Sequence, residues 1–486
     1  MNARRDVVVV GGGISALAAA YQLTGGPTPL GADGPAVTVL ERDARCGGKL
    51  APTEIAGRAV DAGPDGVLAR RPEARTLVEE LGHGELVRPV AASGASLFAR
   101  GRLHALPQGL AIGIPTSWDA LRRSHVLSPA GLARALVDVV APRRAPHPDD
   151  DAAIGDLVAA KLGDEVVTTL VDPMLGGIYA GRVRELSAAA VFPQLLDATA
   201  HGGSLMHALR DATGGGSAPP AGPAFVSLAT GMHSLPDLLV DELRRRGVTF
   251  LTGRDATALR ADGERAGAWV VDTTGGPVRA DGVVVCTPAR DTAHLLHPHA
   301  PDAAAALDGI GYASVAVVTF AFPPGRLPLP ETGTGVLVPP GVVHHAGPRR
   351  GERWLTTALT FLDRKWPDLR RPSETLLRAS VGRVDDERLA GMTDDEVIET
   401  TRLELAELLG PVPAPIDASV TRWTDALPQY AVHHLRRVAD VDAAVERLDG
   451  IELAGAAYRG LGVPACIASG RAAADRLARH LTPTGS

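Results

Sequence analysis

The stretch DVVVVGGGISALAAAYQL, residues 6–23, decides the fold of this chain. Asp6–Val10 is mostly β-branched, as in a buried parallel strand, and residues 14–23 predict a helix. Gly11, Gly13 and Ala16 lie between them with the spacing G-x-G-x-x-A. The glycines permit a tight turn and a close approach of the backbone to a pyrophosphate, and the small alanine lets the helix pack on the strand. The stretch therefore predicts a Rossmann-like dinucleotide site formed by Gly11, Gly12, Gly13, Ile14, Ser15 and Ala16.

The segments after this turn favour FAD over NAD. Residues 36–41, AVTVLE, predict a second strand that ends in Glu41, about 25 residues after Ala16, where an acid binds a ribose hydroxyl in such folds. ERDARCGGKL (41–50) and AVDAGPDGVLARRP (59–72) follow. A second glycine pair and a D-x-G-P loop are similar to the pattern of flavoproteins related to amine oxidases, where they wrap FAD. A simple NAD dehydrogenase would continue with another βαβ unit.

A second glycine-rich turn lies close to the other end of the sequence. Residues 450–458 predict a strand, Gly460, Gly462, Val463 and Pro464 a loop, and residues 467–481 a helix. In the flavoprotein class just named, FAD lies extended, and a turn of this kind holds its isoalloxazine end. Backbone N–H groups at a helix N-terminus can stabilise negative charge on a reduced flavin. The two turns are therefore expected to belong to one discontinuous domain.

Composition limits the location and the partners. A formal charge of −7 and 3% aromatic residues argue against a nucleic-acid partner. MNARRD leads straight into a strand, and no apolar run approaches the roughly 18 residues that span a bilayer. We therefore expect a cytoplasmic protein without a transmembrane segment; peripheral membrane contact is left open. Lysine occurs only at Lys49, Lys161 and Lys365.

Neither a metal site nor a catalytic side chain is predicted. The three cysteines, Cys46, Cys286 and Cys466, lack metal-binding spacing and fit a reducing compartment. Cys466 is expected to be a small buried thiol and not a covalent flavin attachment. No Ser–His–Asp or Cys–His arrangement stands out, and His433 and His434 are interpreted as structural residues.

Five segments resemble the oxygen-dependent protoporphyrinogen/coproporphyrinogen oxidases, above all the Gram-positive coproporphyrinogen III oxidase branch. The similarity runs nearly end to end. It implies non-covalent FAD, oxidation of a tetrapyrrole porphyrinogen with O2 as acceptor, release of hydrogen peroxide, and a place in haem biosynthesis. The segments are VDPMLGGIYAGRVRELSAAAVFPQL (171–195), FVSLATGMHSLPDLLVDEL (225–243), RKWPDLRRPSETLLRASVGR (364–383), RWTDALPQYAVHHLRRV (422–438) and LAGAAYRGLGVPACIASGRAAA (453–474).

The resemblance also implies site residues. Arg71 matches a basic position that faces the porphyrinogen, where a guanidinium could bind a propionate, and Ile178 and Tyr179 are expected to line an apolar wall. Ala256 occupies a position that is usually Val, whose backbone meets the adenine. The implied FAD contacts beyond the first turn are Glu41, Arg42, Lys49, Gly63, Pro64, Asp65, Gly66, Ala256, Trp423, Gly462, Val463 and Pro464.

We expect an α/β fold with a discontinuous Rossmann-like FAD domain, an α+β substrate domain and an inserted helical lobe, because 486 residues exceed what one core usually holds. The lobe contains SPAGLARALVDVVAP, in which Ser128 is the expected N-cap of a helix that starts at Pro129. Residues 213–224 are expected to form a linker. The predicted FAD domain comprises residues 1–93, 213–300 and 436–486, the substrate domain 94–111 and 301–435, and the lobe 112–212.

Several alternatives stay open from the sequence. Protoporphyrinogen IX is the alternative substrate, although Asp65 stands where relatives that prefer it often carry arginine. An amine oxidase, a carotenoid desaturase, or a flavin- or porphyrin-binding protein without turnover are the other readings. A ferrochelatase partner follows from pathway analogy alone.

Overall fold

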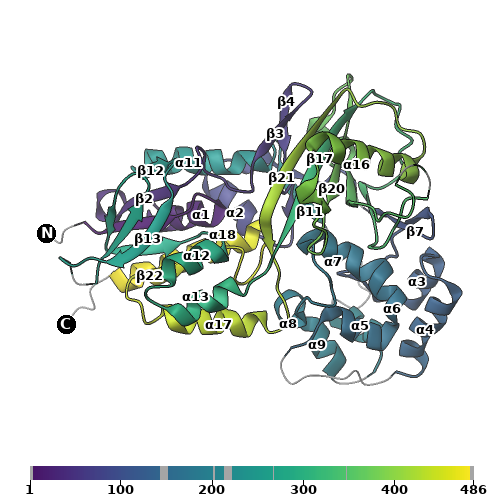
Figure 1. Ribbon diagram of the computed structural model, residues 1–486, viewed down its shortest axis with the longest axis horizontal. Coiled ribbons are helices and arrows are strands. Elements are labelled where there is room, and N and C mark those ends of the chain that lie inside the picture. The colour runs from purple at the N-terminus through teal and green to yellow at the C-terminus, as the bar shows by residue number, and fades with distance from the viewer. Residues whose placement is uncertain are drawn as a thin grey trace.

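The computed structural model describes residues 4–92, 94–142, 151–200, 203–212, 222–265, 267–345, 347 and 349–481. A five-stranded parallel sheet forms the part on the left of Figure 1. Its strands come from three separate stretches of the chain, which gives the predicted discontinuous α/β fold. In spatial order they are β12 (Thr249–Thr252), β2 (Ala36–Glu41), β1 (Asp6–Val10), β16 (Gly282–Val285) and β22 (Ile451–Leu453).

Both ends of the described chain meet on one face of this sheet. Helix α1 (Ile14–Leu23) lies beside α18 (Val463–Leu481) in one core with α11 (Leu235–Arg245) and α2 (Glu73–Glu80) (Figure 1). Buried Gly470 of α18 allows this close packing, because a methyl group there would collide with the backbone of Ser15. The opposite face carries β13 (Ala256–Ala261), β14 (Trp269–Thr273), β15 (Val278–Ala280), α12 (Ala289–Leu296), α13 (Pro301–Asp308) and α17 (His434–Val445).

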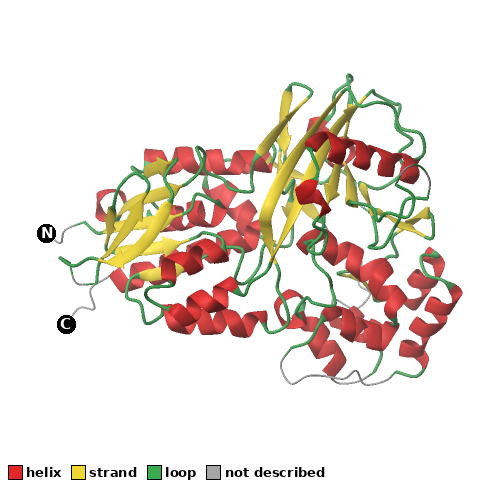
Figure 2. Ribbon diagram, in the orientation of Figure 1, coloured by secondary structure: helices red, strands yellow, loops and turns green. Residues whose placement is uncertain are grey.

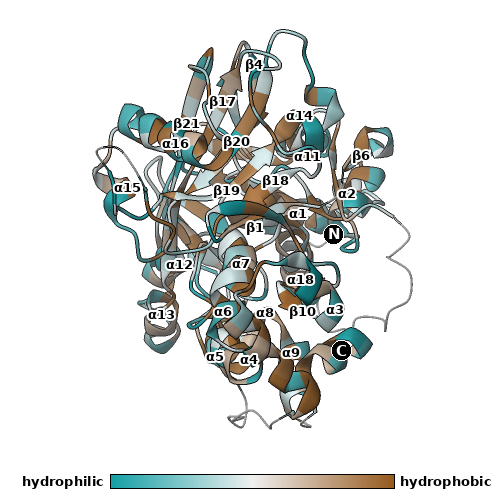
Figure 3. Ribbon diagram, turned by 90° about the vertical axis from the view of Figure 1, so that its right-hand side faces the viewer, coloured by the Kyte–Doolittle hydropathy of each residue, from teal (hydrophilic) through white to brown (hydrophobic). Residues whose placement is uncertain are grey.

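A seven-stranded sheet forms the second part of the molecule, at the upper right of Figure 2. Its neighbours pair antiparallel except for the parallel pair of β18 and β7. Hydrophobic colour gathers on the strands at the centre of Figure 3, and α16 (Asp394–Leu409) packs on this sheet. The order is β21 (Asp417–Pro428), β17 (Tyr312–Phe322), β20 (Thr375–Val381), β19 (Thr356–Phe361), β18 (Gly335–Leu337), β7 (Ser96–Ala99) and β8 (Arg102–Ala105).

The predicted helical lobe lies at the lower right of Figure 1 and has its own core. Ser128 caps α4 as predicted: its hydroxyl accepts a hydrogen bond of 3.0 Å from the Gly131 amide, and Pro129 starts the helix. The predicted linker at residues 213–224 lies mostly outside the described residues. The helices are α3 (Trp118–Ser124), α4 (Pro129–Val140), α5 (Ile154–Leu162), α6 (Asp164–Val166), α7 (Asp172–Tyr179), α8 (Ala188–Val191), α9 (Pro193–Ala200) and α10 (Leu205–Ala212).

Short strands join these parts near the first turn. Strands β3 (Pro52–Ile55) and β4 (Arg58–Asp61) form a hairpin. Strand β11 (Phe225–Leu228) pairs with both β5 (Val67–Leu68) and β6 (Val87–Pro89). None of the helices in the described ranges is both long and apolar enough to cross a membrane.

Two predictions about the last turn were wrong. The strand expected over residues 450–458 ends at Leu453, because the chain turns at Gly455, whose φ is +136°. The helix expected from residue 467 begins at Val463. Val463 and Pro464 therefore belong to its first turn, where a proline costs no helical hydrogen bond.

A buried ion-pair cluster formed by His344, Glu404 and Glu407 lies outside these turns. We expect it to make the stability of the protein depend on pH. The Nδ1 atom of buried His344 lies 2.7 Å from Glu407 Oε1, and its Nε2 lies 3.6 Å from Glu404 Oε1. Glu404 first, and Glu407 with it, raise the pKa of His344 above its ordinary value of 6.5. A raised folded-state pKa contributes stability below the unfolded-state pKa, and this contribution is lost as the pH rises through the folded-state value.

We therefore expect the free energy of unfolding to fall as the pH rises from about 6.5 into the alkaline range. Urea denaturation at a series of pH values would measure it. His344→Gln should flatten this part of the profile, because glutamine does not titrate. If the free energy of unfolding of the variant changed with pH as steeply as that of the wild type, titratable groups other than His344 would be responsible for the pH dependence.

Candidate flavin site

The first glycine turn leaves the N-terminus of α1 open. Gly11 has a φ of +100°, and its amide donates to Leu40 O at 2.8 Å, which fixes the turn at the end of β1. Gly13 is the N-cap of α1 and provides no side-chain hydrogen bond. A Cβ atom on Gly13 would meet nothing within 4 Å. The first-turn amides of α1 thus face a space that can accept an anionic group.

Glu41 supports this turn from the neighbouring strand. Its Oε2 accepts a hydrogen bond of 2.6 Å from the Gly12 amide, and its Oε1 accepts one of 2.8 Å from the Asp43 amide. Each carboxylate oxygen has a second lone pair, so both can still accept a ribose hydroxyl. The exposed side chain of Arg42 instead pairs with Asp291 of α12, at 3.6 Å.

The segment that contains Ala256 lies next to Glu41. The Arg254 amide donates to Glu41 O at 3.0 Å, and Ala256 begins β13 two residues later. The structure thus brings the predicted adenine-side residues together at the ends of β2 and β12.

Lys49 is a partly buried cation beside both turns. The Gly47 amide donates to Gly12 O at 2.8 Å, which places the second glycine pair against the first. Burial lowers the pKa of Lys49, and its ammonium interacts electrostatically with the Cys466 thiol in the first turn of α18. Within the described parts of the chain, this ammonium has no hydrogen-bond or ion-pair partner. An anionic ligand would offset the cost of desolvating it.

Residues 62–66, which we call the FAD loop, are held by side chains from the seven-stranded sheet. Trp423 Nε1 donates to Ala62 O at 3.0 Å, and Arg378 Nη1 donates to Gly63 O at 2.9 Å. A side chain at Gly63 would collide with Lys49 O. Exposed Pro64 lies between these contacts and Asp65.

Asp65 points into the protein. Asp65 is buried, and its carboxylate accepts hydrogen bonds from Lys365 Nζ at 2.9 and 3.1 Å and from Trp366 Nε1 at 3.0 Å. Arg378 Nη2 lies 3.2 Å from Oδ1. Burial alone would raise the pKa of Asp65, but Arg378 and Lys365 hold it well below its usual range. Gly66 follows with its Cα against the ring of Trp366, which a Cβ atom would approach to 2.7 Å.

Two side chains of the LPQY-x-x-x-H segment hold the turn before α18. Tyr430 OH donates to Ala456 O at 2.6 Å and accepts from the Gly460 amide at 2.7 Å. His434 stacks on the Tyr430 ring with a centroid distance of 4.0 Å, and its Nε2 donates to Tyr458 O at 2.8 Å. Burial lowers the pKa of His434, which favours the neutral ring.

The remaining predicted residues at this end also have defined places. The His433 amide donates to Asp151 Oδ2 at 2.7 Å, and His433 is the N-cap of α17. Cys466 is a buried free thiol. Gly462 precedes α18, and a Cβ atom there would have room.

The predicted substrate residues differ in their exposure to solvent. Arg71 is exposed, and its guanidinium pairs with Glu73 at 2.8 Å. Ile178 is 48% exposed, whereas Tyr179 is only 8% exposed and packs against Tyr430 at a centroid distance of 5.7 Å. Burial raises the pKa of Tyr179 to about 12. Ile178 is therefore free to contact a ligand, and Tyr179 belongs to the core of the lobe.

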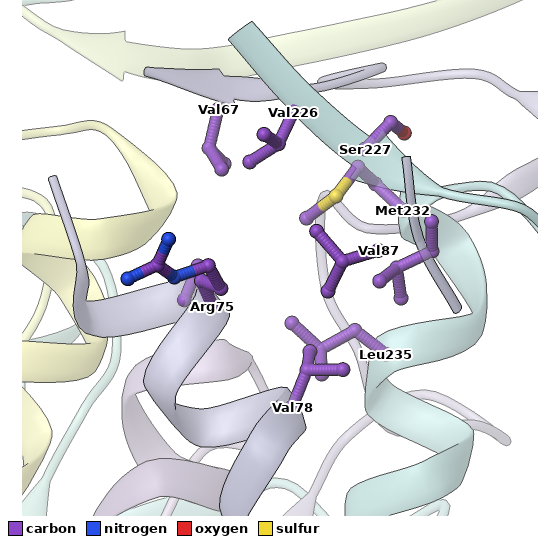
Figure 4. A pocket seen from close by; sticks show the side chains of 10 residues that line it. Val67, Arg75, Val78, Val87, Val226, Ser227, Met232 and Leu235 are labelled. Carbon is purple, nitrogen blue, oxygen red and sulfur yellow. The ribbon is translucent and has the colours of Figure 1, made fainter. Parts of the chain in front are cut away.

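The apolar cavity in Figure 4 is a small gap between packed side chains beside the FAD loop. Val67 and Val226 form one wall, and Val78, Met232 and Leu235 form the other, with Arg75 at one side (Figure 4). Its lining offers little to hold a pyrophosphate or several carboxylates. No group of three or more His, Cys, Asp or Glu side chains suited to a metal ion occurs in the described ranges.

Sequence reasoning missed Lys365, Arg378 and Tyr430. Lys365 and Arg378 lie 300 and 315 residues from the loop residues that they contact, so no local spacing connects them with the loop. One signal was present: lysine is rare in this chain, and in the structure Lys161 is buried and Lys49 and Lys365 are partly buried. Lysine carries a compact point charge, unlike the planar guanidinium of arginine. In an arginine-rich sequence, the few lysine positions are therefore candidates for a specific role.

Two glycine-rich strand-to-helix turns on one parallel sheet, with the FAD loop and an unpaired lysine beside them, define a dinucleotide-binding flavoprotein. The chain belongs to the flavin-containing amine oxidoreductase family, whose profile matches residues 14–478. Within it, the chain belongs with the protoporphyrinogen/coproporphyrinogen oxidases, as the sequence predicted.

Three relatives illustrate the similarity. The coproporphyrinogen III oxidase of Mycobacterium leprae is 36% identical over 475 residues, which cover 96% of this chain and 97% of the relative. The protoporphyrinogen oxidase of Bos taurus is 31% identical over 505 residues, with 97% and 98% coverage. The crystal structure of a putative protoporphyrinogen oxidase from Exiguobacterium superposes with a TM-score of 0.83 at 31% identity and covers 98% of this chain and 99% of that one.

The cofactor of this family member is FAD, and the residues present fit it. The uncapped N-terminus of α1, the open side of Gly13 and the unpaired Lys49 ammonium match a pyrophosphate and its negative charge. Gly47 and Gly63 keep the surrounding backbone close: a side chain at Gly63 would collide with Lys49 O, and Gly47 has a φ of +123°, which favours glycine.

Proposed function

We propose that this protein oxidises coproporphyrinogen III to coproporphyrin III, with O2 as the electron acceptor and hydrogen peroxide as the second product. The porphyrinogen loses six hydrogen atoms, so about three O2 become three H2O2 per porphyrin. The observation that carries the proposal is the 36% identity, over 96% of the chain, with a coproporphyrinogen III oxidase. The two-ended flavin site supports the same chemistry.

The residues of the chain bind and orient in this reaction. FAD, when bound, supplies the two-electron redox chemistry. The first turn of α1 and Lys49 would hold its pyrophosphate, and Glu41 its ribose. The N-terminus of α18 would offer amide dipoles that stabilise negative charge on the reduced flavin. We assign no catalytic side chain.

Arg71 is the proposed contact for a substrate carboxylate. Its ion pair with Glu73 keeps the guanidinium in place but occupies its Nε–Nη2 edge, so a propionate must share or displace this partner. We expect Arg71→Met to raise KM about tenfold with little change in kcat, because an exposed charged hydrogen bond contributes on the order of 1.5 kcal/mol. Steady-state kinetics with coproporphyrinogen III measures this effect.

The neighbouring exposed residue provides a matched control. Arg70→Met removes the same charge one position earlier and should leave KM within about twofold. Equal effects of the two variants would indicate general attraction of an anionic substrate and would remove Arg71 from the site.

Aerobic turnover tests the function itself. Purified protein is given coproporphyrinogen III or protoporphyrinogen IX, and porphyrin fluorescence and peroxide are followed together. Faster oxidation of coproporphyrinogen III, with about three peroxides per porphyrin, is the expected result. Preference for protoporphyrinogen IX would favour the alternative that the bovine relative represents. Failure to oxidise either substrate, with FAD bound, would refute the proposal.

A further inference from the structure

The strongest unexplained feature is the ionic cluster around Asp65. Asp65 belongs to the FAD loop, between β4 and β5, whereas its partners follow about 300 residues later. Lys365 ends α14 (Leu362–Lys365), Trp366 comes next, and Arg378 lies on β20 of the seven-stranded sheet. All of these side chains are largely buried, with 9%, 15% and 11% exposure for the Asp65, Lys365 and Arg378 side chains.

Arg378 links the cluster to the loop backbone. One of its guanidinium nitrogens lies 3.2 Å from Asp65 Oδ1, and another donates to Gly63 O at 2.9 Å. The carboxylate therefore orients the guanidinium that holds the loop two residues earlier. Planar arginine can make both contacts at once, which the single ammonium of lysine cannot do from the same position.

The loop depends on such contacts because it has no regular secondary structure. Residues 62–66 take part in no strand or helix, and side chains from β20 and β21 hold the carbonyls of Gly63 and Ala62. Removing one member of a buried charge cluster leaves the other charges unpaired in the interior. The loss of stability is therefore much larger than when an exposed ion pair is broken. The loop conformation is thus tied to the seven-stranded sheet.

We propose that Asp65, Lys365 and Arg378 are positioning residues that hold the FAD loop in its FAD-binding conformation from the seven-stranded sheet. Affinity for FAD then depends on side chains outside the parallel sheet that carries both glycine turns. Asp65 acts in the protein interior through its cationic partners, which differs from its predicted roles as an FAD contact and as a marker of substrate preference. The inference rests on FAD as the cofactor and does not depend on which porphyrinogen is oxidised.

The test measures FAD affinity of apoprotein by the quenching of free flavin fluorescence, without substrate. Asp65→Asn should raise the Kd for FAD at least about tenfold. The absorption bands of the bound flavin should also be less well resolved than in the wild type. Asp65→Glu keeps the charge and should recover part of the affinity. A Kd for Asp65→Asn within twofold of the wild-type value would overturn the proposal.

A buried pair of the same kind in the helical lobe provides the control. Lys161 Nζ lies 3.2 Å from Asp138 Oδ1, and both side chains are essentially inaccessible to solvent. Asp138→Asn should lower the thermal midpoint and leave the Kd for FAD of the folded protein unchanged. An equal increase in Kd for both variants would show that FAD affinity follows global stability, and the proposal would fail.

A second variant keeps the test valid if Asp65→Asn does not fold. Arg378→Lys retains the positive charge, so the net charge of the cluster is unchanged, but lysine lacks the planar fork whose separate nitrogens reach Asp65 and Gly63 O. We expect a Kd about tenfold higher than that of the wild type. Wild-type affinity in this variant would contradict the proposed role of Arg378. Because no porphyrinogen is present, these outcomes are separate from failure of the turnover assay.

Discussion

Replacing Gly13 with aspartate should weaken FAD binding strongly while the fold is retained. Gly13 is the N-cap of α1, with φ −71° and ψ 175°, a conformation that any residue adopts. A Cβ atom has room there, so the substitution introduces no collision. Aspartate is among the best N-cap residues and, in place of glycine, should stabilise the apoprotein by a few tenths of a kcal/mol. Its carboxylate would also occupy the position and repel the charge of the pyrophosphate.

We therefore expect the Kd for FAD to rise at least about 100-fold, equivalent to about 2.8 kcal/mol. Flavin fluorescence quenching measures the affinity, and urea denaturation of the apoprotein measures the stability. Gly13→Asn is the matched control, because it provides a similar cap without charge and should weaken binding less. An aspartate variant that binds FAD with wild-type affinity would place the pyrophosphate elsewhere.

The first turn could be predicted from sequence because its physics is local. Strand β1, the glycines and helix α1 adjoin one another, and their predicted limits, Asp6–Val10 and Ile14–Leu23, agree with the structure. The last turn was predicted in kind but not in its limits. Hydrophobic residues continue past Leu453 although the strand has ended, because Ala454, Ala457 and Tyr458 are buried by tertiary packing.

Side-chain partners across long separations could not be predicted in the same way. The sequence marks Asp65 as part of a loop, but only the folded chain shows that Lys365 and Arg378 surround its carboxylate. The pair Ile178 and Tyr179 is similar. Adjacent residues at the end of α7 point in different directions, and Tyr430 determines which of them is covered. Hydrophobic character alone does not distinguish a ligand wall from a core.

The structural role of the motif Tyr430-x-x-x-His434 can also be seen only in the folded chain. These two side chains hold the backbone of residues 456, 458 and 460, in the turn that leads into α18. Tyr430 in addition packs on Tyr179, so one residue joins the helical lobe to the second glycine turn. His433, next to His434, contacts Asp151 through its backbone.

Tyr430→Phe should lower the free energy of unfolding by about 2 kcal/mol, because it leaves the Gly460 amide and the Ala456 carbonyl without their shared partner in a largely buried place. The ring contacts with His434 and Tyr179 are kept, so any change reports on the hydroxyl. Urea denaturation measures the loss, and hydrogen exchange of the amides between residues 456 and 462 should accelerate before the rest of α18 is affected. Tyr312→Phe is the control: its ring packs near the same turn, but its hydroxyl accepts a hydrogen bond of 2.8 Å from the Ala289 amide, and among the described residues it makes none to residues 456–462. It should cost about 1 kcal/mol and leave exchange at residues 456–462 unchanged. Unchanged exchange there in Tyr430→Phe would mean that packing, and not the phenol hydroxyl, fixes the second glycine turn.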